Sequence, residues 1–265
     1  MALCISGTFR TFERCAPSLI RNVINAFPGR VDVFMQAYFT HEPYDSWWIA
    51  GQDDSNWPLM QRAIDIYKPK AICMGDMEPM ASVWKKRFHE EKGMKLAYNN
   101  HHGEFCLQLN GIKNAYNLAK QYDDYDVFAR CRYDSWFYEP VDFSENWQFK
   151  DSHIMLSRGV TGARSWHGCP YDQEHKTRSQ LNPFFKINDQ FFWSSQKPYE
   201  YLAHLIDYAE TYCDPEGENV LFETENLYYR HMLYKDSRYR AILDESVYQV
   251  LVRQNTPDDH LIYER

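Results

Sequence analysis

Charged side chains follow an apolar segment between residues 126 and 138, whose sequence is DVFARCRYDSWFY. The apolar residues 127–129 predict a buried strand. Side chains two residues apart in a strand share a face, so Arg130, Arg132 and Asp134 are expected to project together near its carboxyl end. Two guanidinium groups beside one carboxylate suit a phosphorylated ligand, with or without a metal ion, because ligands of open α/β sheets collect at the carboxyl ends of strands. A structural Arg–Asp network that caps the strand is the alternative interpretation.

Strand-like and helix-like segments alternate along the sequence, and they must position these side chains. This alternation predicts an α/β fold with a mostly parallel central sheet flanked by helices. Strands are expected at about residues 2–6, 31–37, 70–74, 126–132 and 152–157, and helices at about residues 17–27, 57–67, 105–121 and 199–210. In the third helix, Leu107, Ile112, Tyr116 and Leu118 are the residues expected to face the core.

The segment at 130–134 also carries a resemblance to a known family. A strand that ends in Arg-x-Arg-Tyr-Asp, preceded by a helix and followed by an aromatic-rich turn, resembles the donor-site region of GT-A-type nucleotide-diphospho-sugar glycosyltransferases. In that family a short acidic motif, often Asp-x-Asp, holds a divalent cation against the diphosphate. The resemblance implies that Asp134 is a ligand of Mn²⁺ or Mg²⁺. Arg132 stands where the first acid of the usual pair is expected, so one ligand is missing and metal dependence is left open.

The beginning of the chain matches the same resemblance. Residues 2–11 read as a strand that ends in a Gly turn, with Arg10 just beyond it. The resemblance implies that this turn and the later strand bind the donor and neutralise the leaving diphosphate, through Ser6, Gly7, Thr8, Arg10, Arg130, Arg132 and Asp134.

A third segment, Ile187–Ser195 with the sequence INDQFFWSS, resembles the family's acid in a hydrophobic segment beside the acceptor. Glycosyl transfer to a hydroxyl needs a base that takes the acceptor proton. Asp189 is the first candidate, because the aromatic residues around it favour a raised carboxyl pKa. Capping of a turn at this position is its alternative role. Glu223 and Glu225 are the next catalytic candidates, although acids at the start of a helix are also favoured by the helix dipole.

The resemblance covers most of the chain and implies one GT-A-like domain over residues 1–265. About 1–135 would form the nucleotide-sugar-binding half and about 136–265 the acceptor-side half. Within the latter, residues 159–181 contain three Gly, several charges and little periodicity. A loop of this length is either functional or disordered, and we interpret it as an acceptor-side lid or as a disordered loop.

Composition restricts the setting in which the protein works. A formal charge of −8 disfavours a general nucleic-acid binder, because such proteins neutralise phosphates with Lys and Arg. Seven Cys, an odd number without C-x-x-C pairs, indicate reduced thiols and a cytoplasmic protein. No apolar stretch approaches the ~18 residues of a membrane span. Aromatic residues make up 17% of the chain, which suits stacking on sugar rings, although packing in the core is the better explanation for any single ring.

Together these patterns predict a glycosyltransferase that moves a hexosyl or pentosyl group from a UDP- or GDP-linked donor to a glycan or other hydroxyl acceptor. A sugar-nucleotide nucleotidyltransferase is an alternative, but residues 7–11 lack the Gly-rich, Lys-containing run expected of one. A catalytically silent carbohydrate-binding protein on the same fold is the alternative outside enzymes.

Overall fold

The structure is a computed structural model that describes residues 1–7, 9, 11–39, 57–76, 83, 86, 104–159, 189–209, 227–228, 231 and 239–251. Its strands are β1 (Ala2–Gly7), β2 (Asp32–Phe39), β3 (Ala71–Asp76), β4 (Phe128–Cys131), β5 (Ser135–Phe137), β6 (His153–Gly159), β7 (Phe192–Ser194) and β8 (Arg240–Leu251). Its helices are α1 (Phe12–Leu19), α2 (Trp57–Tyr67), α4 (Glu104–Lys120), α5 (Gln196–Ala203) and α6 (Leu205–Tyr208). A π-helical turn, η1 (Ile20–Ile24), continues α1, and a 3-10 turn, η3 (Trp147–Phe149), precedes β6.

All eight described strands belong to one sheet with the order β3-β2-β1-β4-β7-β6-β8-β5. The pairs β2–β3, β1–β2, β1–β4 and β6–β8 are parallel. The pairs β4–β7, β6–β7 and β5–β8 are antiparallel. The α/β fold with a mostly parallel central sheet flanked by helices is therefore confirmed.

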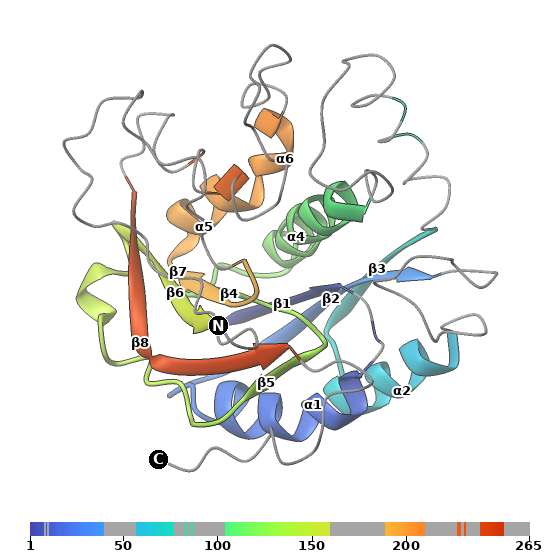
Figure 1. Cartoon of the computed structure of the whole chain (residues 1–265), viewed down its shortest axis with the longest axis horizontal. Helices are drawn as coiled ribbons and strands as arrows, with labels where there is room; N and C mark the ends of the chain where they lie inside the picture. Colours follow the sequence, from blue (N-terminus) through green and yellow to red (C-terminus); the bar gives the residue numbers. More distant parts are fainter. Residues whose placement is uncertain are drawn as a thin grey trace.

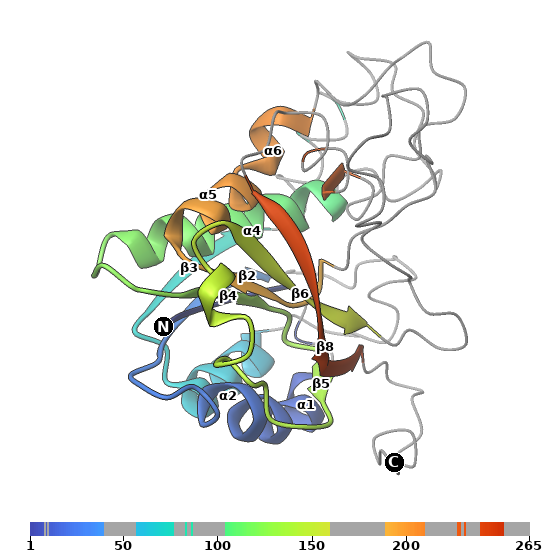
Figure 2. The ribbon, with the colours of Figure 1, turned by 90° about the vertical axis from the view of Figure 1, so that its left-hand side faces the viewer.

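Helices cover both faces of the central strands. In Figures 1 and 2, α1 and α2 lie on one side of the sheet, and α4, α5 and α6 lie on the other. The sequence of β1 reflects this, because Ala2 and Cys4 join the core beside α4 while Leu3 and Ile5 join the core beside α1. A parallel strand buried on both faces is apolar throughout, which is why β1 shows no polar alternation.

The order in which the chain builds the sheet creates a switch point beside β1. The chain first adds β2 and β3 on one side of β1, with α1 and α2 on one face of the sheet. It then returns through α4, on the opposite face, to place β4 on the other side of β1. In open α/β sheets, ligands bind outside the carboxyl ends of the strands at such a point of reversal. A ligand site is therefore expected at the residues that end β1 and β4.

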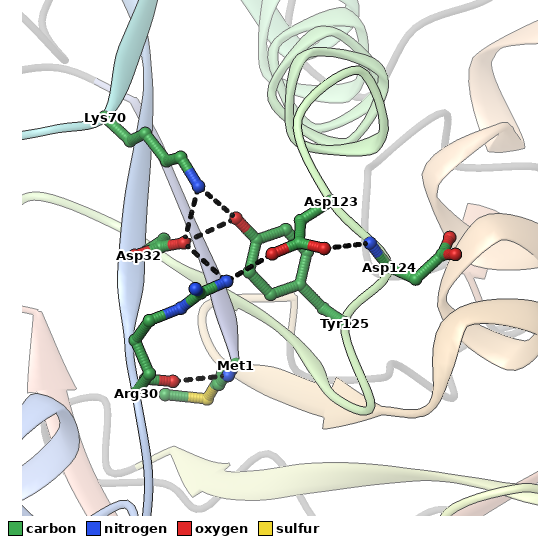
Figure 3. A network of polar contacts seen from close by, with 7 residues as sticks. All are labelled: Met1, Arg30, Asp32, Lys70, Asp123, Asp124 and Tyr125. Carbon is green, nitrogen blue, oxygen red and sulfur yellow. Dashed lines mark hydrogen bonds and ion pairs between the residues drawn. The ribbon is translucent and has the colours of Figure 1, made fainter.

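A network of ion pairs and hydrogen bonds joins the amino ends of the central strands, at the end of the sheet opposite the switch point. Lys70, just before β3, lies 2.9 Å from Oδ2 of Asp32 at the start of β2, and the Tyr125 hydroxyl donates to the same oxygen at 2.7 Å. Arg30 lies 3.3 Å from this oxygen and also pairs with Asp123 (Figure 3). Burial disfavours the ionised Asp32, but the bonds from Tyr125 and Lys70 outweigh it and lower the pKa of Asp32. This network holds the strands at the end opposite the switch point.

Several elements differ from those expected. The five expected strands are all present, but β5, β7 and β8 were not foreseen. The first helix begins at Phe12, five residues before the expected start at Pro17, and Pro17 lies inside it. The last expected helix, over 199–210, is divided into α5 and α6 at His204.

Candidate functional site

A bidentate ion pair follows the carboxyl end of β4. Arg132 Nε lies 2.8 Å from Oδ1 of Asp134, and Arg132 Nη2 lies 2.9 Å from Oδ2. The Asp134 side chain is completely buried, whereas that of Arg132 keeps 11% of its exposure. Two parallel bonds fix the plane of the guanidinium as well as its position. This pair is the Arg–Asp network that the sequence offered as an alternative.

Arg130, on β4 itself, is a fully buried cation. Its Nη1 donates to the backbone carbonyl of Gln190 at 2.6 Å. Its Nε and Nη2 are buried without a hydrogen-bond partner among the described residues. A buried guanidinium requires a compensating charge close by. That charge is Asp189, the residue next to the carbonyl that Arg130 binds.

Asp189 lies in the same cluster and has only 3% of its surface exposed. Its Oδ2 accepts a hydrogen bond from Nε2 of Gln108 on α4. Burial raises the pKa of the Asp189 carboxyl above its usual value, and the positive charges of Arg130 and Arg132 oppose that rise. A carboxylate whose pKa is displaced in this direction is suited to accept a proton near neutral pH.

The backbone that carries Asp189 is held from two further strands. Gln249, on β8, donates from Nε2 to Oε1 of Gln190 at 3.4 Å and to Oγ of Ser157 on β6 at 2.7 Å. The Ser157 hydroxyl in turn donates to the carbonyl of Phe191 at 3.2 Å. The segment from Asp189 to Phe191 is thus fixed by β4, β6 and β8 together.

The carboxyl end of β1 lies directly beside Arg132. Gly7 has φ +133°, and a Cβ at this position would lie 3.9 Å from Cγ of Arg132. The hydroxyl of Ser6 is buried without a hydrogen-bond partner among the described residues. On the α4 side, a Cβ on Gly111 would lie 3.3 Å from Cγ of Gln36, so this glycine lets α4 approach the ends of β1 and β2. Ser6, Gly7, Arg132 and α4 therefore meet at the switch point.

Gln108 was missed by the sequence reasoning. It is the polar residue of α4 that joins the cluster, and it is partly exposed. The spacing of the sequence could have placed Gln108 on the buried face of α4, because it precedes the buried Ile112 by four residues and the buried Tyr116 by eight. Residues at this spacing share one face of a helix.

The geometry around Asp134 is that of an ion pair, and the Mn²⁺ or Mg²⁺ that the family resemblance implies stays a prediction. Both carboxylate oxygens of Asp134 accept hydrogen bonds from Arg132. In the part of the chain that the structure describes, no three His, Cys, Asp or Glu side chains are grouped so that they could hold a metal ion. The positive charge that pairs with Asp134 in the described residues is the guanidinium of Arg132.

Comparisons with known proteins add little to this geometry. No family model matches the chain, and no curated protein matches it. Among solved structures, the chain is similar to mouse xyloside xylosyltransferase 1 in its apo form, with a TM-score of 0.45 and 9% sequence identity. The similarity covers 97% of this chain and 98% of that chain. The fold assignment rests on the strand order and pairing of this chain itself.

The structure brings together most of the site residues expected from the sequence. Ser6, Gly7, Arg130, Arg132, Asp134 and Asp189 all lie at or beside the carboxyl ends of β1 and β4. Thr8, Arg10, Glu223 and Glu225 lie outside the described residues, as does the expected lid beyond Gly159. No helix among the described residues is long and apolar enough to cross a membrane.

Proposed function

We propose that this protein is a glycosyltransferase that binds a nucleoside-diphosphate sugar at the carboxyl ends of β1 and β4 and transfers the sugar to a hydroxyl acceptor. The observation that carries the proposal is the convergence of Arg130, Arg132 and Asp189 at the switch point of the sheet. The hydroxyl of Ser6 there is buried without a hydrogen-bond partner among the described residues. Unsatisfied groups of this kind at a ligand-binding position favour a polar ligand.

The two arginines have different parts in this proposal. Arg132 lies beside Gly7 and retains exposed surface, which supports assigning the contact with the diphosphate to its guanidinium. Asp134 holds that guanidinium in a fixed plane. Arg130 is fully buried, so it acts on the leaving group through its field rather than by direct contact. Fixed cations that stabilise developing negative charge are among the strongest contributors to catalysis.

Asp189 is proposed as the base. It takes the proton of the acceptor hydroxyl while the acceptor oxygen forms a bond to the anomeric carbon. The bond between that carbon and the diphosphate oxygen breaks, and its electron pair leaves with the nucleoside diphosphate. The raised pKa of Asp189 suits this role, because a base works best when its pKa lies near the operating pH.

Calorimetry with UDP, GDP, UMP and free monosaccharides tests the proposal. We expect UDP or GDP to bind, and Arg132→Lys to weaken that binding about tenfold or more, because lysine keeps the charge but loses the planar fork. Arg62→Lys is the matched control, since Arg62 lies on α2 and pairs with Glu13 at the surface. Binding of monosaccharides without any nucleotide would overturn the transferase and support a carbohydrate-binding protein.

A further inference from the structure

The side-chain amide of Gln108 connects two charged groups that the sequence places far apart. Its Oε1 accepts a hydrogen bond from Nη1 of Arg132 at 3.3 Å, and its Nε2 donates to Oδ2 of Asp189. A guanidinium can only donate and an ionised carboxylate can only accept. One orientation of the amide therefore satisfies both neighbours, and that orientation presents its donor to Asp189.

The charged and titratable groups around Asp189 come from few elements in the described part of the chain. Arg130 on β4 and Arg132 just after it both favour the ionised form of Asp189, and Arg132 also forms an ion pair with Asp134. Tyr228 lies close to Arg130 and is a further titratable group of this cluster. The side-chain hydrogen bond that favours the ionised form of Asp189 comes from Gln108.

We infer that Gln108 is a positioning residue, whose amide holds the Asp189 carboxylate ionised and oriented at a fixed place relative to the guanidinium of Arg132. The inference rests on the proposed function, because it assigns Gln108 a role in presenting the proposed base. Helix α4 is a suitable carrier, since Gly111, less than one turn further on, lets it pack closely on the ends of β1 and β2.

Removing the amide should make Asp189 harder to ionise. A hydrogen bond to a charged group, lost from a partly exposed partner, corresponds to a rise of about one pH unit in the pKa of the carboxyl. Gln108→Met keeps the length of the side chain but removes both hydrogen bonds. Gln108→Glu keeps an acceptor for Arg132 and places a second negative charge beside Asp189, so it should raise the pKa at least as far.

The experiment follows the Asp189 carboxyl carbon by ¹³C NMR in protein labelled at Asp, with the signal assigned by its loss in Asp189→Asn. Wild type, Gln108→Met and Gln108→Glu are titrated without nucleotide. Asn110→Leu is the matched control, because it removes an amide from the same helix that donates to the Tyr38 hydroxyl at 3.2 Å. We expect the Asp189 pKa to rise by about one unit in both Gln108 variants and to stay unchanged in the control.

Two outcomes would overturn the inference: an Asp189 titration that is the same in wild type and the Gln108 variants, or an equal rise in Asn110→Leu. If Gln108→Met does not fold, Gln108→Glu decides the question alone. UDP and GDP calorimetry on the same proteins reports on the proposed function separately. A nucleotide that binds wild type and Gln108→Met within about threefold, while transfer falls, would match a residue that acts through Asp189 rather than on the donor.

Discussion

The buried pair between Arg132 and Asp134 allows a quantitative prediction for Asp134→Asn. This change leaves the guanidinium of Arg132 without its carboxylate, and breaking a buried ion pair in this way costs about 3–5 kcal/mol. We take the lower end, about 3 kcal/mol, because asparagine keeps one acceptor oxygen and water reaches the Arg132 side chain, which is 11% exposed. For a domain of this size the loss corresponds to a fall in Tm of roughly 6–8 °C.

Thermal unfolding followed by circular dichroism measures this effect. Asp151→Asn is the control, since Asp151 is 75% exposed and pairs with Lys150 at 3.2 Å. Exposed pairs contribute at most about 1 kcal/mol, so the control should lower Tm by no more than roughly 2 °C.

The double variant Arg132→Met with Asp134→Leu separates the cost of an unpaired charge from the value of the pair. Replacing both partners by apolar residues of similar size leaves no buried charge, so much of the lost stability should return. A Tm for Asp134→Asn within about 1 °C of wild type would refute the reasoning, because it would mean that the pair does not remain buried in solution.

Three further predictions concern the base, the metal and the amino-end network. Asp189→Asn should leave UDP or GDP affinity nearly unchanged and reduce transfer to the acceptor by about 100-fold or more; a parallel loss of nucleotide affinity in calorimetry would place Asp189 in the donor site instead. Chelation by EDTA should change nucleotide affinity by less than about tenfold, because Arg132 already occupies both oxygens of Asp134. Tight Mn²⁺ binding that requires UDP or GDP would contradict this. Asp32 has a lowered pKa in the folded protein, so its contribution to stability is complete above its usual value of 3.8 and is lost as the pH falls below it. The difference in Tm between wild type and Asp32→Asn should therefore shrink from pH 7 to pH 3; a constant difference would show that the charge of Asp32 is not what stabilises the strands.

The parallel half of the sheet could be predicted from the sequence because its strands are mostly apolar runs. The predicted strand at 2–6 lies within β1, and the predicted strand at 31–37 overlaps β2. Helices cover both faces of these strands. The short strands β5 and β7 contain only three residues each, too few to show a period. In β8 the polar run at 244–246 coincides with a shift in register against β6, where the strand stops alternating regularly. Such irregularity depends on the partner strand, and no local pattern encodes it.

In the site too, local sequence patterns predicted some features, whereas others depend on contacts between distant segments. The shared direction of Arg130 and Arg132 follows from the period of a strand, and the apolar sequence around Asp189 indicated its burial. The sequence offered the pairing of Asp134 with Arg132 as one of two interpretations, but the turn between β4 and β5 sets its bidentate geometry. Gln108 joins the cluster only because α4 packs across β1, which a single helix cannot reveal.

The aromatic residues illustrate a limit of composition. Several of them pack against one another in the core beside α4: Tyr116, Phe128 and Tyr199 have ring centroids 5.2–5.5 Å apart. These three are buried, so they stabilise the core and do not form an exposed surface for sugar stacking. An aromatic-rich composition therefore cannot by itself identify a carbohydrate site.

The position of β5 in the sheet affects the order in which the sheet can form while the chain is synthesised. Only three residues separate β4 from β5, yet β7, β6 and β8 lie between them in the sheet, so the sheet must curve until its far edge returns beside β4. The partner of β5 is β8, the last described strand to leave the ribosome, and β8 also carries Gln249. Pairings between residues so distant in sequence form slowly. During synthesis strands β1 to β4 emerge first, Arg130 gains its partners when residues 189–190 follow, and that segment is fully held only when Gln249 has emerged.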